Sequence, residues 1–355
     1  MRLDVSIMYL GLGMEATDQL ELVLLAEQLG YDTAWVAEAY GSDAATMLGW
    51  LAARTTRIGL GSAMFQMPAR SPAMTAMTAA TLDVLSRGRM RLGVAPSGPQ
   101  VAEGWHGEPY GSALRRTREY VQILRLVLSG ARLEYDGEIY RLPLPGGRGR
   151  PLKLNIAPVQ EQIPIYVGGL GPKSVALAAE LADGWIPMFL SPAHYREQFL
   201  PHLEAGASRA GRPLSDLDVN PIFQLFIDDD IERARDQIRP FLALYVGGMG
   251  SKGANFYHDL VTRYGFESAA DSVQELFLGG NRSEAERALP AELIDAVSLC
   301  GPPAVVRERL ALLSSLGIDH ITVMPPFGGW TSEFPGHLRR LAEIASAPAP
   351  TLAAS

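Results

Sequence analysis

Two stretches of sequence decide the fold expected for this chain: LGYDTAWV at residues 29–36 and LGIDHITV at residues 316–323. In each, a glycine ends an amphipathic segment, an aspartate turn follows, and a short apolar run begins. This is the pattern of a helix that leads into a strand. Because the two joints lie near the two ends of the chain, we expect the first and last strands to meet, as they must in a closed barrel.

The same alternation of apolar runs and amphipathic segments continues between the two joints, and it favours parallel strands joined by right-handed crossovers. Strands are predicted at residues 5–9, 34–37, 58–64, 90–94, 163–167, 184–187, 217–227 and 321–324. Helices are predicted at residues 17–29, 43–53, 71–86, 114–128, 172–182, 193–210, 231–245 and 302–316. Eight such units predict a (β/α)8 TIM barrel. The alternative is an open doubly wound sheet, although no GxGxxG motif follows the first strand to favour its dinucleotide-binding form.

The chain is predicted to form a single domain over residues 1–345, followed by a flexible tail at 346–355. Three segments exceed the loops of a regular barrel, at about 98–113, 130–162 and 246–297. The second is expected to hold a hairpin (132–135 with 138–141), and the third to hold helices near 254–264, 268–278 and 283–288. Long loops gather over the C-terminal mouth of a barrel, so we expect these insertions to surround the ligand site.

The composition narrows the possible functions. Thirty-one basic and 39 acidic residues give a net charge of −8, which argues against a nucleic acid or an anionic membrane as the main partner. The sole cysteine, Cys300, excludes an internal disulfide framework and a cysteine-based metal cage. The first residues lack a signal-peptide layout, and no apolar stretch is long enough to span a membrane. We therefore expect an enzyme of a reducing, cytoplasmic compartment.

The loop after the fifth predicted strand is a candidate anion site. Glycines let a backbone approach a ligand closely, and the free N–H groups of a helix start attract negative charge. The alternative is a tight turn between a strand and a helix, without a ligand. The loop consists of Gly168, Gly169, Leu170, Gly171, Pro172, Lys173 and Ser174.

Other candidate residues lie where the remaining strands end. Glu38 ends the second strand, and its carboxylate is expected either to hydrogen-bond a ligand and act as acid or base, or to pair with an arginine of a neighbouring loop. Ala63 and Met64 form a small bulge, and Ser97 and Gly98 would let a flat ligand lie against the backbone. An apolar substrate pocket is expected from Tyr40, Phe65, Trp105, His106, Met188 and Phe327, although such clusters are more often core or lid packing. No HxH or HExxH motif occurs, so no metal is predicted.

Several motifs are shared with a known family. The segments RSP at 70–72, TLDVLSRGR at 81–89 and LGV at 92–94 resemble the bacterial luciferase-like monooxygenase superfamily. The run SGPQVAEGWHG at 97–107 resembles the branch that contains the coenzyme F420-dependent oxidoreductases. The resemblance spans roughly residues 1–345 and implies a luciferase-like TIM barrel that holds a deazaflavin across its C-terminal mouth. Flavin mononucleotide (FMN) relatives share most of these motifs, so FMN is the alternative cofactor.

The resemblance also implies roles for individual residues. The cofactor phosphate would bind at Gly168–Ser174, Ser97 and Gly98 would contact the cofactor, and Glu38 would lie near its ring. A non-proline cis peptide at Ala63–Met64 would support the back of the ring. Relatives are commonly dimers, so a homodimer is expected.

Two positions depart from the sugar-phosphate dehydrogenases of the family. Those enzymes have a histidine where this chain has Ala39 and a glutamate where it has Pro99. We therefore expect hydride transfer that reduces an activated C=C, C=N or C=O bond of a small substrate rather than sugar-phosphate oxidation. The alternatives are an FMN-dependent two-component monooxygenase and a cofactor-binding barrel without catalysis.

Overall fold

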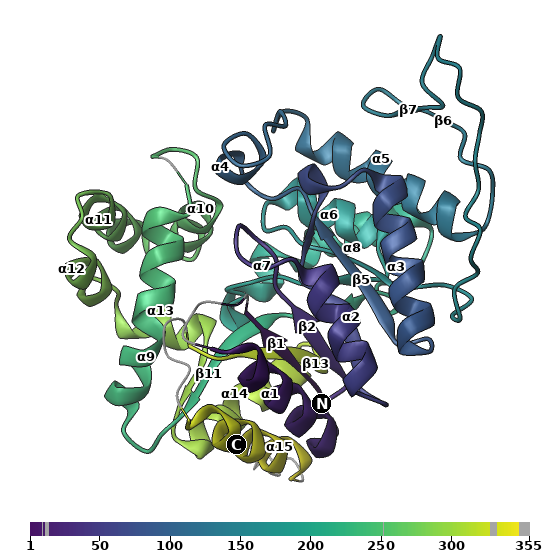
Figure 1. Ribbon diagram of the computed structural model, residues 1–355. Coiled ribbons are helices and arrows are strands. Elements are labelled where there is room, and N and C mark those ends of the chain that lie inside the picture. The colour runs from purple at the N-terminus through teal and green to yellow at the C-terminus, as the bar shows by residue number, and fades with distance from the viewer. Residues whose placement is uncertain (9, 11–13, 251, 327–331, 348–355) are drawn as a thin grey trace.

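The computed structural model describes residues 1–8, 10, 14–250, 252–326 and 332–347, and it shows a parallel sheet surrounded by helices (Figure 1). The neighbouring strands follow the order β10-β9-β8-β5-β3-β2-β1-β13-β11-β12, with β4 also paired to β5 and β6 paired only to β7. The strands are β1 (Arg2–Ile7), β2 (Thr33–Val36), β3 (Gly59–Ser62), β4 (Phe65–Gln66), β5 (Met90–Ala95), β6 (Tyr135–Asp136), β7 (Arg141–Leu142), β8 (Ile165–Val167), β9 (Gly184–Trp185), β10 (Asp218–Val219), β11 (Ile222–Ile227), β12 (Leu299–Gly301) and β13 (His320–Met324).

The sheet curls into a TIM-barrel-like arrangement. The first and last strands meet as predicted, since β1 pairs in parallel with β13 and with β2. On the other side, a parallel bridge joins Met188 to Ile222, and the Ile222 N–H donates to the carbonyl of Pro187 at 2.9 Å. These bonds connect the β9 side of the sheet to the β11 side.

Helices cover the outside of the sheet (Figure 1). The main helices are α1 (Ala16–Leu29), α2 (Ala44–Arg54), α3 (Pro72–Ser86), α5 (Ala113–Leu128), α6 (Pro172–Leu181), α8 (Leu200–Ala210), α9 (Ile231–Ala243), α14 (Pro303–Ser315) and α15 (Phe334–Ser346). Shorter helices are α4 (Pro99–Ala102), α7 (Tyr195–Gln198), α10 (Phe256–Arg263), α11 (Glu267–Leu278), α12 (Arg282–Arg287) and α13 (Ala291–Val297). Single turns are η1 (Met67–Ala69), η2 (Pro192–His194), η3 (Leu214–Asp216) and the π-helical η4 (Leu244–Gly248). Among the described residues, the model contains no helix with the length and apolar character of a bilayer span.

The helix ends follow the local chemistry predicted from the sequence. The Ser71 hydroxyl accepts a hydrogen bond from the Met74 N–H, and Pro72 occupies the first position of α3. The Asp43 carboxylate caps α2, and Gly30 ends α1 in the left-handed conformation with φ of 81°.

Some predicted elements differ from the structure because prolines interrupt them. The strand predicted at 217–227 is divided into β10 and β11, with Pro221, which has no N–H, between them. The helix predicted at 193–210 is three pieces, and Pro201 lies in the first turn of α8. Helices α13 and α15 and strand β12 were not predicted. Ser346, expected to start the flexible tail, is the last residue of α15, and residues 348–355 lie outside the described part.

The segment 130–162 was expected at the C-terminal mouth, and that placement stays a prediction. It follows α5 and leads into β8. Its hairpin, displaced by a few residues to β6 and β7, is held by the Glu119 carboxylate, which accepts the N–H groups of residues 138–140. The part of the segment that leads back to β8 forms hydrogen bonds at the start of β5. The N–H groups of Val159 and Gln160 donate to the Asp83 carboxylate, and the Gln160 amide donates to the Met90 carbonyl.

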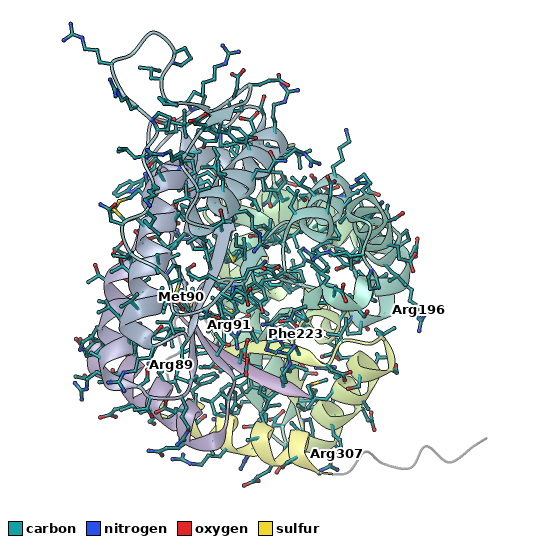
Figure 2. The ribbon with its side chains drawn as sticks, turned by 90° about the vertical axis from the view of Figure 1, so that its right-hand side faces the viewer. Arg89, Met90, Arg91, Arg196, Phe223 and Arg307 are labelled. Carbon is teal, nitrogen blue, oxygen red and sulfur yellow. The ribbon has the colours of Figure 1, made fainter. Side chains whose placement is uncertain are left out.

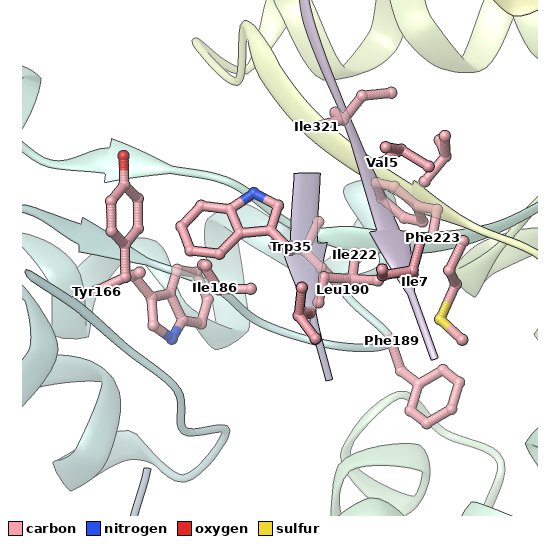
Figure 3. Close-up of a cluster of buried hydrophobic side chains, with 14 of the residues drawn as sticks. Val5, Ile7, Trp35, Tyr166, Ile186, Phe189, Leu190, Ile222, Phe223 and Ile321 are labelled. Atoms are coloured by element: carbon pink, nitrogen blue, oxygen red, sulfur yellow. The ribbon is translucent and has the colours of Figure 1, made fainter. Parts of the chain in front are cut away.

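Two aromatic rings fill the centre of the barrel. Trp35 of β2 and Tyr166 of β8 meet edge to face with ring centroids 4.9 Å apart, and Figure 3 shows both beside Ile186. A Cβ added to Gly61 would overlap the Trp35 ring, and one added to Gly184 would overlap the Tyr166 ring. Glycines on the neighbouring strands, directly beside Trp35 and Tyr166 in the register, therefore leave the space that the rings occupy.

The residues of β5 alternate between the interior and the helix layer (Figure 2). Arg91 donates to the Thr33 hydroxyl inside the barrel at 2.7 Å. Arg89 lies just before the strand and donates to the Thr55 hydroxyl and carbonyl at the end of α2. Gly93 lies beside Tyr166, whose ring is in the interior, so Arg91, Gly93 and Ala95 share the interior face.

Candidate active site at the barrel mouth

One layer of inward-facing residues forms the floor of the mouth, at the carboxyl ends of the strands. The pairing register of the strands determines which residues belong to this layer, because residues that lie side by side on parallel strands point to the same face of the sheet. Gly93 pairs with Tyr166, Met188 with Ile222, and Gln224 with Met324. The last inward-facing residues of these strands, here called the mouth layer, are Ala95, Gly168, Met188, Gln224 and Met324.

The mouth layer differs between its two sides. A Cβ added to Gly168 would lie 3.8 Å from the Ala95 Cβ and 3.7 Å from Met64 Cγ, so these three residues lie together. The small size of Ala95 and Gly168 leaves the backbone of β5 and β8 accessible, which suits a flat ligand. The opposite side carries the longer side chains of Met188, Met324 and Gln224.

A bulge lies between β3 and β4, next to this small-residue side. The Ser62 hydroxyl donates to the Gly93 carbonyl at 2.8 Å and accepts from the Gly93 N–H at 3.0 Å, so it bridges the gap in the strand ladder. The Ala63–Met64 peptide bond is cis, at the position expected from the family resemblance. The bulge presents Met64 toward Gly168. The predicted contact of Ala63 and Met64 with a cofactor remains a prediction.

The loop Gly168–Ser174 leads from β8 into α6. Gly169 has φ of 154°, and a Cβ there would lie 2.8 Å from the Ser174 side chain, so a glycine is required. The Val175 N–H is bonded to the Gly171 carbonyl at 3.0 Å. The N–H groups before Val175, those of Lys173 and Ser174, belong to the helix start, which has no helical partners for them. The loop thus offers donors and a positive dipole end at the mouth.

The third long segment supports this loop. Arg263, at the end of α10, donates to the Leu170 carbonyl at 3.0 Å. Its buried Nε has no hydrogen-bond partner among the described residues. The neighbouring Tyr264 hydroxyl donates to the Phe189 carbonyl at 3.0 Å and accepts from the Ser191 N–H. Residues 246–297 therefore hold two mouth loops in place.

The first long segment contacts the third. Tyr110 and Phe256 approach with ring centroids 6.4 Å apart, and Figure 1 places α4 and α10 on the same side of the molecule. Burial raises the pKa of Tyr110 above its usual value, so its hydroxyl stays neutral. These two segments lie on the mouth side of the barrel, as expected.

Glu38 forms the ion pair that the sequence left as one of two alternatives. Its carboxylate binds both terminal nitrogens of Arg70, at 2.6 and 2.8 Å, and accepts the N–H groups of Ala44 and Gln66 at 3.2 Å each. Its side chain is only 6% exposed. Burial opposes the charged form of Arg70, but Glu38 and Asp43 raise its pKa above its usual value. With its oxygens engaged in this way, Glu38 organises the loops around the mouth; its predicted acid or base role remains untested.

The other predicted pocket residues divide between the mouth and the surface. His106 lies with Nε2 3.3 Å from the Gln66 Oε1, and the Gln66 amide donates to the Ala39 carbonyl. Ser97 has φ of 63°, and a Cβ added to Gly98 would meet nothing within 4 Å, so the loop after β5 borders open space. Tyr40 and Trp105 are exposed.

The expected pocket role of Phe65 needs a correction. It pairs with Val94 of β5, which faces the helix layer, and it is buried beneath the Arg70 guanidinium, 4.5 Å from its ring centroid. The side chain therefore packs outside the barrel and supports Arg70. Phe327 lies outside the described residues.

A cluster at the other end of the barrel could be mistaken for a metal site. Asp4, Asp32 and His320 bring ligand atoms within 4.8 Å of one another. However, both ring nitrogens of His320 face carboxylates, Nε2 at 2.9 Å from Asp4 and Nδ1 at 2.8 Å from Asp218. Burial alone would lower the pKa of His320, but these two carboxylates raise it to about 9. A protonated imidazole is an ion-pair partner rather than a metal ligand.

A groove of about 500 Å³ lies outside the barrel, between α5, α6, α8 and the hairpin. Its acidic Glu180 binds both Arg118 and Arg209, which hold the pKa of this carboxyl at about 2. The groove starts near Lys173 but is separate from the mouth layer.

The sequence analysis missed four residues at the mouth, which are Ala95, Gln224, Arg263 and Met324. Gln224 was detectable as the single polar residue in the apolar run IFQLFI at 222–227. Arg263 left no such signal, because it belongs to a helix whose position depends on the tertiary structure.

Comparisons with known proteins agree with this geometry. The family model described as luciferase-like monooxygenase matches residues 3–320. A provisionally named coenzyme F420-dependent oxidoreductase of Mycobacterium tuberculosis is 41% identical over 330 residues, covering 91% of this chain and 94% of its own length. The 5,10-methylenetetrahydromethanopterin reductase of Archaeoglobus fulgidus is 31% identical over 312 residues, covering 86% of this chain and 89% of its own.

A solved structure shares the fold. The coenzyme F420-dependent tetrahydromethanopterin reductase of Methanopyrus kandleri superposes with a TM-score of 0.80 at 23% identity, covering 96% of this chain and 97% of that one.

Proposed function

This chain belongs to the luciferase-like monooxygenase family, and we propose on that basis that it is an oxidoreductase that transfers a hydride between coenzyme F420 and a small organic substrate. Family membership makes it an enzyme, and the relative that is 41% identical to it carries a coenzyme F420-dependent name. The observation that carries the proposal is the mouth itself, where a floor of small residues lies beside a helix start with free N–H donors.

The residues of the mouth fit a flat ring with an anionic tail. Ala95 and Gly168 leave a surface without bulky side chains beside Met64, and the space above Gly98 is open. Lys173 and the N–H groups at the start of α6 suit a phosphoryl group. The buried, unpartnered Nε of Arg263 leaves a further donor beside this loop. We assign ring binding to Ala63, Met64, Ser97 and Gly98, and phosphate binding to Gly168–Ser174.

When bound, coenzyme F420 supplies a deazaflavin ring whose central carbon gives or takes a hydride. The chain supplies position and shielding. The bulge at Met64 supports one face of the ring, and the Glu38–Arg70 pair fixes the loops on either side of it. The segments that meet at Tyr110 and Phe256 limit the access of water to the reacting atoms.

The substrate proposed for this site carries an activated C=C, C=N or C=O bond. The support is chemical: Ala39 and Pro99 occupy positions where sugar-phosphate dehydrogenases of the family have a histidine and a glutamate, and neither residue can move a proton. His106 contacts Gln66 near Ala39 and is a titratable side chain on this side of the mouth, and we propose water or His106 as the proton source.

The finer architecture is part of the same proposal. We propose a single (β/α)8 domain over residues 1–345 that forms a homodimer in the cytoplasm. Size-exclusion chromatography with light scattering tests the dimer, since a monomer mass of 38.4 kDa would contradict it.

Fluorescence titration tests the proposed cofactor. We expect oxidised and reduced coenzyme F420 to bind one per chain with micromolar affinity or better, and FMN to bind more weakly. Tight FMN binding without F420 binding, together with oxygen consumption on addition of reduced FMN, would establish the monooxygenase alternative instead. F420 binding without turnover of any enone, imine, ketone or alcohol in a broad panel would leave the non-catalytic alternative.

A further inference from the structure

Gln224 carries an amide that is buried in the barrel. Its side chain is 3% exposed, and neither Oε1 nor Nε2 has a partner among the described residues. A folded protein that leaves both atoms of an amide unpaired loses stability at that position. Such groups in native proteins call for an explanation, and a ligand that satisfies them is one.

The amide points into the barrel at the mouth layer. Gln224 lies beside Met324 in the register of β11 and β13, and two residues earlier Ile222 lies beside Thr322. The Thr322 hydroxyl donates to the Asn220 side chain, which in turn donates to Asp4 within the barrel. Because alternate residues share a face, Gln224 and Met324 also face the interior.

Gln224 lies across the barrel from the bulge. Along the sheet order β3-β2-β1-β13-β11, its strand is four steps from β3. A ring that rests its back on Met64 would turn its free face toward β11. Gln224 therefore belongs to the substrate side of the site, and this step rests on the proposed function.

The surroundings of the amide define the group that would bind it. Met324 lies beside Gln224 in the register, Met188 lies beside Ile222 two residues earlier, and their thioethers are at most weak acceptors. A primary amide presents an acceptor oxygen next to an N–H donor. Both atoms are satisfied together by a ligand edge that presents a donor next to an acceptor, as in a lactam or a pyrimidinone.

We propose that Gln224 is a specificity-determining residue that binds the substrate through an amide-type edge, an N–H adjacent to a C=O. The class of substrate is then a lactam-containing molecule, with the reducible bond held toward the cofactor and the lactam edge held by Gln224. A substrate without such an edge leaves the amide unpaired and binds less tightly.

The test compares two probes on the F420-loaded enzyme, 2-pyrrolidinone as the lactam and cyclopentanone as the ketone without an N–H. Saturation-transfer NMR titrations give both dissociation constants. We expect wild type to prefer the lactam by about tenfold, the worth of about one net hydrogen bond. Gln224→Met should abolish the preference, and Gln224→Glu, which keeps acceptor oxygens but lacks the N–H, should reduce it.

A measurement without any ligand complements the titration. Because Gln224→Met removes an unpaired buried amide and keeps the side-chain volume, we expect it to raise Tm by about 1–4 °C. A lower Tm, or equal binding of the two probes to wild type, would overturn the proposal. Failure of wild type to bind F420 would overturn the proposed function instead, whereas F420 binding without lactam preference would refute only the role of Gln224.

Discussion

Replacement of Gly171 by aspartate is the sharpest test of the anion site. Gly171 caps α6 with φ of −77°, a conformation open to any residue, and a Cβ there meets only the Ser174 Oγ at 3.6 Å. Aspartate and asparagine are both favoured at a helix cap, so each variant should fold. Both also offer an oxygen to the free N–H groups of the helix start. The difference between the two variants therefore isolates the added charge.

The expected magnitude follows from Coulomb's law. A carboxylate at position 171 would lie about 5 Å from a phosphoryl group bound at the start of α6, and at an effective dielectric constant of about 20 two unit charges repel by about 3 kcal/mol. The loop is half-exposed, so salt and solvent reduce this to about 1–2 kcal/mol, or about 5–30-fold in affinity.

The assay is the fluorescence titration of coenzyme F420 into wild type, Gly171→Asn and Gly171→Asp at low and high salt. We expect Gly171→Asp to bind about 5–30-fold more weakly than Gly171→Asn, with the gap narrowing as salt rises. Equal affinities for the two variants at low salt would show that no anion lies at this loop.

Three further predictions concern stability. Protonated His320 should contribute about 3 kcal/mol to the free energy of unfolding below pH 6.5, and this contribution should be lost as the pH rises through about 9, because the folded state binds the proton more tightly than the unfolded state. Denaturant titrations across this pH range measure it, and a wild-type free energy of unfolding that changes with pH no more than that of His320→Gln would show that His320 is not charged. Gly61→Ala should lower the free energy of unfolding by about 1–3 kcal/mol, since the new methyl group displaces Trp35, and near-ultraviolet circular dichroism should record the altered ring environment. Glu38→Gln should cost about 1–3 kcal/mol, because Arg70 loses the Glu38 charge and keeps its pairing with Asp43, yet it should keep F420 affinity within about threefold; a large loss of affinity with unchanged Tm would instead restore a direct cofactor role.

The fold was predictable because its signals are local. Gly30 and Gly317 mark helix ends, and the apolar runs that follow them are strands β2 and β13. The break at Pro221 was visible in the sequence and was overlooked.

The site was less predictable because its decisive contacts are distant in sequence. Glu38 and Arg70 lie 32 residues apart, so the sequence could offer the ion pair only as an alternative. Arg263 reaches Leu170 across 93 residues. Gln224 stands out in the sequence as a polar residue in an apolar run. Whether its amide has a hydrogen-bond partner depends on the tertiary structure.

The paired rings of Trp35 and Tyr166 have a consequence for how this enzyme could be altered. The two rings, here called the plug, fill the barrel between the mouth and the ion network around His320. Side chains above the plug can be exchanged without admitting solvent to the charges below it, and distant sites of this kind contribute independently to stability. Libraries that randomise positions 188, 224 and 324 should therefore yield many folded proteins, and selection among them would redirect the enzyme toward new molecules while the lower half of the barrel stays as it is.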